Sequence, residues 1–180
     1  GGGGGGDEET VEKVYLASYT DATGTLKSDI SIKADSNCTL ILPAGTMAKN
    51  AIGTRLSWIS AAPIPEGKPS PAPPADGFLL SLSYSLEPTG ATFTPPLILS
   101  LRYDDTLIPQ GIAESDLKIG YYDSAAGRWV NLSNCQVDSE KNIITAPLSH
   151  FSSYAVVGYL PQAPDFSMSN LTISPAEVNP

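Results

Sequence analysis

The sequence contains no cluster of basic residues, and this absence excludes several classes of partner. Its 10 Lys and Arg residues are outnumbered by 19 Asp and Glu residues, which gives a formal net charge of −9. Nucleic-acid phosphates and anionic membrane surfaces are bound mainly through Lys and Arg, so we expect neither as a partner. The excess of negative charge is more typical of an exposed protein that its charge keeps soluble.

Long hydrophobic runs and zinc motifs are also missing. No apolar stretch approaches the roughly 20 residues that a helix needs to span a bilayer, so we expect no membrane insertion in this segment. The lack of a C-x-x-C pair or a His-Cys cluster disfavours a zinc site, and no cofactor is expected. Asp104 and Asp105, with Asp123 or Asp138, offer oxygen ligands for calcium. No D-x-D-x-D-G loop contains them, so we expect solvated turn carboxylates.

Helical periodicity is equally scarce, whereas alternation of apolar and polar residues is abundant. Only residues 47–51 and 113–117 suggest short helical turns. In residues 78–88, Leu80, Leu82, Tyr84 and Leu86 alternate with serines, and residues 95–105 repeat the pattern. This period of two is typical of half-buried antiparallel strands.

Turn residues and further strands complete the predicted fold. Two hairpins are predicted, with turns at residues 123–127 and 138–142. Further strands are expected at residues 14–19, 54–59 and 153–159. The sequence therefore predicts an all-β fold, an antiparallel β-sandwich of roughly nine short strands with little helix.

Changes in composition divide the chain into three parts. Residues 1–10, six glycines followed by acidic residues, indicate a flexible linker or a cloning remnant, and residues 11–160 form the predicted sandwich. Within the sandwich, the proline-rich residues 61–77 are either a surface excursion between strands or a ligand for a proline-binding module. Residues 161–180 are interpreted as a linker and the first strand of a following module. We interpret the chain as a piece of a longer, multi-domain protein.

Four motifs in order carry a resemblance to a known family. They are CTLILPAGTM, FTPPLILSLRYDD, DLKIGYYDSAAGRWVNL and VDSEKNIITAPLSHFSSYAVV. Together, over residues 25–158, they resemble the ZU5-like β-sandwich domain of prokaryotic cell-surface proteins, with the proline loop as an insertion. Residues 165–180 resemble the first strand of a CARDB-type adhesion module.

The resemblance implies an extracellular or cell-surface location and a non-catalytic structural or adhesion role. The implied partners are other domains of the same chain, with cell-wall glycan or neighbouring subunits as further candidates.

Some ZU5-like domains cleave themselves at a His-Phe-Ser site, which gives an alternative function. The resemblance assigns His150 as the base, Phe151 as the residue whose carbonyl is attacked, and Ser152 as the nucleophile. A serine hydroxyl needs such a base at neutral pH, and histidine has a suitable pKa of about 6.5. The other interpretation is that Phe151 anchors a final strand and that His150 is a turn or core histidine.

Cysteines, sequons and tryptophans leave further alternatives open. Cys38 and Cys135 either form a disulfide that closes a loop of about 97 residues or remain free thiols. Asn37, Asn131 and Asn170 begin Asn-x-Ser/Thr sequons, which favour a secreted setting only weakly. Trp58, Trp129 and the tyrosines either line a sugar platform, as in a carbohydrate-binding module, or pack within the fold.

Overall fold

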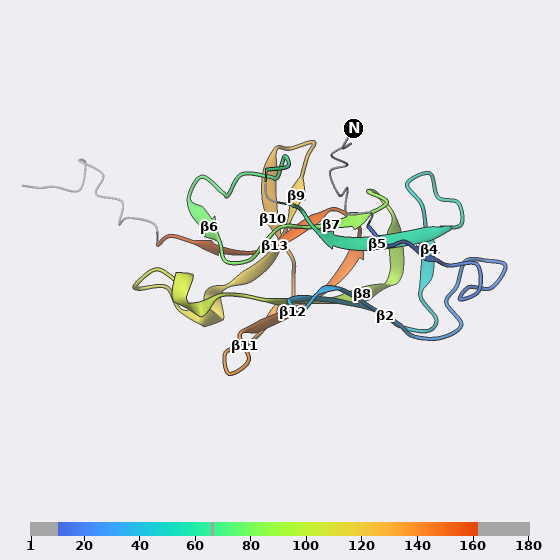
Figure 1. Ribbon diagram of the computed structural model, residues 1–180, viewed down its shortest axis with the longest axis horizontal. Helices are drawn as coiled ribbons and strands as arrows, with labels where there is room; N and C mark the ends of the chain where they lie inside the picture. Colours follow the sequence, from blue (N-terminus) through green and yellow to red (C-terminus); the bar gives the residue numbers. More distant parts are fainter. Residues whose placement is uncertain (1–10, 66, 162–180) are drawn as a thin grey trace, which may run out of the picture.

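Two antiparallel sheets packed face to face form the protein, which confirms the predicted all-β sandwich (Figure 1). The computed structural model describes residues 11–65 and 67–161. The predicted linker at residues 1–10 lies outside the described residues, as does all of the predicted segment 161–180 except Pro161. No helix in the described ranges is long and apolar enough to cross a membrane.

The described chain forms thirteen strands rather than the roughly nine expected; the expected strand over residues 78–88 is divided in two, and residues 47–49 form a strand where a helical turn was expected. The strands are β1 (Val14–Tyr15), β2 (Ile30–Asp35), β3 (Cys38–Leu42), β4 (Met47–Lys49), β5 (Trp58–Pro63), β6 (Gly77–Leu79), β7 (Tyr84–Glu87), β8 (Thr92–Arg102), β9 (Lys118–Asp123), β10 (Arg128–Asn131), β11 (Gln136–Asp138), β12 (Ile143–His150) and β13 (Ser153–Tyr159). Two short 3₁₀ turns, η1 (Asp105–Leu107) and η2 (Glu114–Asp116), complete the fold.

The strands are divided between a seven-stranded sheet and a six-stranded sheet. The seven-stranded sheet has the order β1-β5-β7-β13-β9-β10, and β6 also pairs with β13. The six-stranded sheet has the order β11-β12-β8-β3-β2, and β4 also pairs with β8. Both predicted hairpins are confirmed, as β9–β10 and β11–β12.

The core lies between the sheets and follows the alternation of the sequence. In β8, Leu97, Leu99 and Leu101 are buried, whereas Ile98 between them is exposed. The same core cluster includes the buried aromatic side chains of Tyr84, Phe93, Phe151 and Tyr154. Burial of large apolar side chains of this kind is the main favourable contribution to folding.

The expected continuous strand over residues 78–88 is wrong, because the chain breaks between β6 and β7. Leu82, which the alternation places in the core, is 57% exposed. At the break, the hydroxyl of Ser81 accepts a 2.9 Å hydrogen bond from the backbone N–H of Val156 in β13. A side chain thus supplies an acceptor for a strand amide where the regular ladder is interrupted.

The two expected helical turns have different outcomes. Residues 113–117 do contain the 3₁₀ turn η2, but residues 47–49 form β4, which pairs with Phe93 and its neighbours in β8. Phe93 is buried, and so is Ala48 in β4 opposite it. Tertiary pairing therefore decides the conformation of a segment whose own sequence preference is weak.

The acidic turn residues act as local caps. Asp104 accepts hydrogen bonds from the N–H and hydroxyl of Thr106 at the start of η1, and Asp123 accepts from the N–H groups of Ala125 and Ala126. Within the described ranges, no group of three or more His, Cys, Asp or Glu residues is placed to hold a metal ion.

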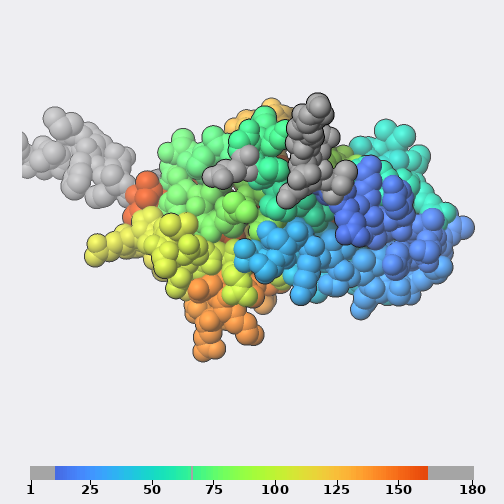
Figure 2. Space-filling view, in the orientation of Figure 1, coloured from blue at the N-terminus to red at the C-terminus, as the bar shows by residue number. Residues whose placement is uncertain are grey.

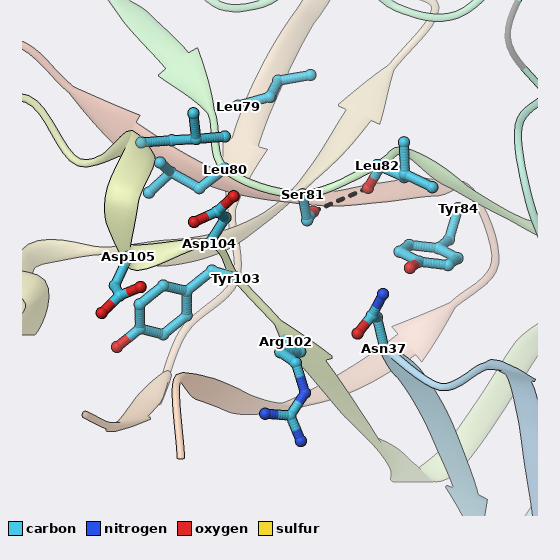
Figure 3. A pocket seen from close by; sticks show the side chains of 11 residues that line it. Asn37, Leu79, Leu80, Ser81, Leu82, Tyr84, Arg102, Tyr103, Asp104 and Asp105 are labelled. Atoms are coloured by element: carbon cyan, nitrogen blue, oxygen red, sulfur yellow. Dashed lines mark hydrogen bonds between the residues drawn. The ribbon is translucent and has the colours of Figure 1, made fainter. Parts of the chain in front are cut away.

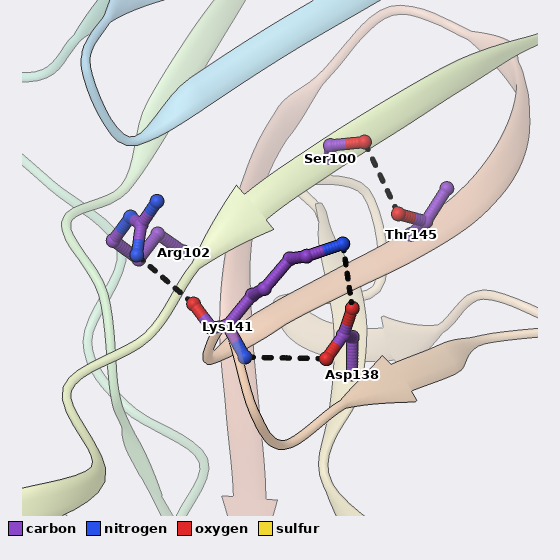
Figure 4. A network of polar contacts seen from close by, with 5 residues as sticks. All are labelled: Ser100, Arg102, Asp138, Lys141 and Thr145. Atoms are coloured by element: carbon purple, nitrogen blue, oxygen red, sulfur yellow. Dashed lines mark hydrogen bonds and ion pairs between the residues drawn. The ribbon is translucent and has the colours of Figure 1, made fainter.

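A polar network fastens the β11–β12 turn to β8 (Figure 4). Arg102 donates a 2.9 Å hydrogen bond to the carbonyl of Lys141, and the N–H of Lys141 donates to Asp138. The Lys141 ammonium also lies 3.4 Å from the Asp138 carboxylate, but both side chains are well exposed. An exposed pair of this kind contributes little to stability, so the network serves mainly to position the turn.

Candidate functional site

The triplet His150-Phe151-Ser152 lies where the chain passes from one sheet to the other. His150 is the last residue of β12 in the six-stranded sheet, and Ser153 is the first residue of β13 in the seven-stranded sheet. The pairing of β12 with β8 shifts register between Leu148 and His150. The irregularity lies directly before the chain crosses the sandwich.

Phe151 is held on both its side chain and its backbone. Its ring is 1% exposed and packs against Phe93, with 4.6 Å between the ring centroids. Its N–H donates to the carbonyl of Ala91 at 2.9 Å, and its carbonyl accepts from the N–H of Gly90 at 3.1 Å. Gly90 has φ +84°, a conformation that glycine adopts without strain. The loop between β7 and β8 therefore satisfies both backbone groups of Phe151.

Ser152 directs its hydroxyl to a neighbouring strand. Its Oγ–H donates a 2.8 Å hydrogen bond to the backbone carbonyl of Tyr122 in β9. Its own carbonyl accepts from the N–H of Leu86 in β7. No hydrogen bond joins the Ser152 hydroxyl to the His150 ring in the part of the chain that the structure describes. The proposed nucleophile and base are neighbours in sequence, but they are not paired.

The imidazole of His150 is half-buried among tyrosines. It meets the ring of Tyr121 edge to face, with centroids 4.5 Å apart and an interplanar angle of 88°. Burial lowers the pKa of His150 below its usual 6.5, and the negative charge of Asp123 opposes this only in part. The ring is therefore neutral at neutral pH, which is the charge state that a general base requires.

The backbone carbonyl of His150 accepts a hydrogen bond from the hydroxyl of Tyr154. Burial raises the pKa of that hydroxyl, so it remains protonated and available as a donor. The triplet lines a small pocket of about 300 Å³ together with Thr89 and Ser124. The His150 carbonyl, which accepts one hydrogen bond, thus lies at the same surface depression as the Ser152 hydroxyl and the neutral His150 imidazole.

The two cysteines are free thiols in the structure, so the Cys38–Cys135 disulfide that the sequence left open is not formed. Cys38 is buried in β3, where burial and the nearby charge of Asp35 raise its pKa to about 12. The Cys135 thiol lies 3.3 Å from the carbonyl of Leu132 and 3.4 Å from the N–H of Ile119.

Two of the three sequons lie on the described surface. Asn37 is exposed in the turn between β2 and β3, and Asn131 is exposed at the end of β10. The amide oxygen of Asn131 accepts a 3.0 Å hydrogen bond from the hydroxyl of Tyr159. Asn170 lies outside the described residues.

The structure does not bring the two tryptophans together. Trp58 is in β5 and Trp129 in β10, and three strands of the seven-stranded sheet separate them. The Lys13 ammonium lies 4.1 Å from the centre of the Trp58 ring, while Trp129 is only 8% exposed. A shared sugar platform built on both indoles is therefore not formed.

A cavity that the sequence did not indicate opens at the break between β6 and β7 (Figure 3). Its volume is about 510 Å³, and it is lined by Asn37, Leu80, Ser81, Leu82, Tyr84, Arg102, Tyr103 and Asp104, among others. Arg102 is the last residue of β8 and Asp104 lies just beyond it, whereas Asn37 lies in the turn between β2 and β3, where its carbonyl accepts a 2.8 Å hydrogen bond from the N–H of Arg102. Because the cavity depends on an interruption in an apparently regular strand, no sequence signal marks it.

No family model and no curated protein sequence matches the chain. The resemblance to ZU5-like and CARDB-type domains therefore stays a prediction.

Proposed function

We propose that residues 11–160 are a non-catalytic structural module of a multi-domain extracellular surface protein. The observation that carries this proposal is the role of the His-Phe-Ser triplet as a fixed junction between the sheets. Phe151 is buried in the core, and its backbone and that of Ser152 are bonded to the segments around β7 and β8. The only histidine of the chain thus belongs to a segment whose contacts hold the two layers together.

The surface of the module supports an exposed location. The chain carries a net charge of −9, and its two described sequons, at Asn37 and Asn131, are exposed. A sandwich with long ladders, such as the pairing of β8 with β12, resists bending along the strands. These properties suit a spacer that holds other domains of the chain at a distance.

Single-molecule stretching of the full chain tests the role as a spacer. The expected result is one cooperative unfolding event that releases the folded residues 14–159, which extend to roughly 500 Å. The variant Phe151→Ala should unfold at a lower force with the same gain in length. Gradual extension without a force peak, or several small steps, would contradict a role as a single rigid module.

Self-processing at the bond between Phe151 and Ser152 is the second candidate, and one observation favours it. The N–H of Gly90 already donates to the Phe151 carbonyl, where negative charge would develop during attack. In the proposed step, Ser152 Oγ bonds to the carbonyl carbon of Phe151, and the C–N bond to Ser152 breaks. His150 takes the hydroxyl proton and passes it to the leaving amine, and water then hydrolyses the resulting ester.

This step requires the Ser152 hydroxyl to leave Tyr122 and turn toward the Phe151 carbonyl. Intact-mass measurement of the purified full chain, incubated over several days at pH 7–8, tests the reaction. Cleavage would give residues 1–151 and 152–180, would be abolished by Ser152→Ala, and would persist in the matched control Ser153→Ala. A single uncleaved mass throughout the incubation excludes self-processing and leaves the structural proposal in place.

A further inference from the structure

The outer face of the seven-stranded sheet carries an aromatic cluster that the proline-rich segment covers. We call Tyr122, Trp129 and Tyr159, from β9, β10 and β13, the aromatic platform. They pack around Ala155 and Val157, which face away from the main core. The segment over them is residues 69–75, which we call the proline segment; Figure 1 shows the loop that contains it running between β5 and β6. The loop's residues form part of the surface seen in Figure 2.

One polar contact anchors the proline segment to the platform. The indole N–H of Trp129 donates a 2.7 Å hydrogen bond to the carbonyl of Ala72, across 57 positions of sequence. The ring of Tyr122 meets the Trp129 indole nearly edge to face, with centroids 5.7 Å apart. The sheet therefore presents a donor and flat apolar surfaces side by side.

The proline segment covers the platform without filling it. A cavity of about 470 Å³ lies between Pro73 and Pro74 on one side and Tyr122, Trp129 and Tyr159 on the other. A second cavity, of about 520 Å³, is lined by Pro69, Pro71 and Tyr122, among others. Both cavities open to solvent, so the proline segment leaves part of the aromatic platform accessible.

The backbone of the proline segment contributes acceptors rather than donors. Pro69, Pro71, Pro73 and Pro74 lack an N–H, and the described hydrogen bonds include no backbone bond donated by residues 69–76. The carbonyl of Ala72 accepts from the platform, and the sequence Pro71-Ala72-Pro73-Pro74 has the form P-x-x-P. Aromatic grooves bind extended proline-rich peptides in this way, through flat rings and a donor to a peptide carbonyl.

We propose that the aromatic platform is a recognition site for P-x-x-P segments and that the chain's own residues 69–75 are its resident ligand. Tethering at both ends gives this ligand a high effective concentration, so it outcompetes a free peptide of the same sequence. Substitutions that weaken the internal ligand increase the fraction of chains in which the site is open. The apparent affinity for a free peptide rises with that fraction. The site adjoins the triplet at residues 150–152, because the backbone carbonyl of Tyr122 accepts the hydrogen bond of the Ser152 hydroxyl.

Peptide titration of the full chain tests this proposal. In a Trp58→Phe background, Trp129 is the only tryptophan, so its fluorescence reports on the platform alone. The probe is a peptide with the sequence of residues 68–75, Lys-Pro-Ser-Pro-Ala-Pro-Pro-Ala. The open variant additionally carries Pro71→Ser, Pro73→Ser and Pro74→Ser, none of which lies in a strand. We expect a saturable response, with an apparent Kd at least 10-fold lower in the open variant than in the background chain.

Controls separate recognition from nonspecific contact. A peptide with every proline replaced by alanine should bind the open variant at least 10-fold more weakly. Hydrogen exchange of the Trp129 indole N–H gives a second readout, which should be at least 10-fold faster in the open variant and slow again with bound peptide. If the open variant does not fold, the single substitution Pro73→Ser replaces it in both measurements.

Three results would overturn the proposal. They are a flat fluorescence response of the open variant up to millimolar peptide, equal binding of the alanine peptide, and an indole N–H that stays equally protected after the substitutions. Any of them would show that residues 69–75 are only a fixed cover of the sheet.

Discussion

The hydroxyl of Tyr84 lies within hydrogen-bond distance of both carboxylate oxygens of Asp35, at 3.1 and 3.0 Å. Tyr84 begins β7 of the seven-stranded sheet, and Asp35 ends β2 of the six-stranded sheet, so the contact joins the two layers. Burial, and then the charge of Asp35, raise the pKa of Tyr84. The hydroxyl therefore remains protonated, and so a donor, at neutral and mildly alkaline pH.

Removing this hydroxyl by Tyr84→Phe should lower the free energy of unfolding by about 1–2 kcal/mol, because a hydrogen bond to a charged acceptor is lost. Urea unfolding followed by circular dichroism measures the change. The matched control is Tyr15→Phe, whose side chain is 64% exposed and which should change stability by less than about 0.5 kcal/mol. Equal effects of the two substitutions would show that the contact between the sheets contributes nothing.

His150 should make stability depend on pH as the pH falls through about 6.5, the usual pKa of the unfolded side chain. Its pKa is lowered in the folded state, so the unfolded chain binds the proton more readily. The contribution of His150 is therefore complete above the unfolded pKa of about 6.5 and is lost as the pH falls toward the folded value. Because one proton is involved, the slope cannot exceed about 1.4 kcal/mol per pH unit, and solvent screening of the half-exposed ring keeps it below that limit.

The control for this dependence is His150→Gln, which should flatten the stability profile as the pH falls through about 6.5. The pKa values of Asp21 and Asp138 are lowered by hydrogen bonds from Thr23 and Lys141, so their contributions are lost only near pH 4 and below. Chemical unfolding at half-unit pH intervals distinguishes these ranges. An unchanged slope in His150→Gln would assign the dependence to other groups.

Phe151→Ala should lower the free energy of unfolding by about 3–5 kcal/mol, since it removes a fully buried ring that packs against Phe93. Leu82→Ala is the informative comparison, because the alternation predicts a core position while the structure exposes this side chain. It should cost less than about 0.5 kcal/mol. A large loss of stability in Leu82→Ala would show that residues 80–83 continue the strand in solution.

Thiol labelling should distinguish the two cysteines. At pH 8 a maleimide should react with Cys135 in the native protein but leave Cys38 unmodified, because Cys38 is buried and its pKa is raised to about 12. Denaturation without reductant should make both thiols reactive. If neither is labelled after denaturation until a reductant is added, the two cysteines are disulfide-bonded.

Local sequence signals predicted those parts of the fold that depend on local geometry. The turns at residues 123–127 and 138–142 were predictable because Gly127 and Asn142 both adopt positive φ values in short connections. The interruption at residues 80–83 was not predictable. There, the hydroxyl of Ser81 bonds to Val156, 75 positions away, and no local pattern indicates such a contact.

The candidate site shows the same limit. The residues His150, Phe151 and Ser152 were found from sequence, but the partners that hold them, Gly90 and Tyr122, come from distant parts of the chain. The outer aromatic cluster was also missed, because the sequence around Trp129 is compatible with either a core or a surface position. Trp129 is covered only because the proline segment of the folded chain passes over it.

The position of β13 has a consequence for synthesis on the ribosome. This strand, the last in the described chain, lies inside the seven-stranded sheet between β7 and β9. Until residues 153–159 emerge from the exit tunnel, the nascent chain displays two open strand edges that attract other extended chains. Translational pausing just before this point would prolong an aggregation-prone intermediate, whereas a pause after it would let the sheet close.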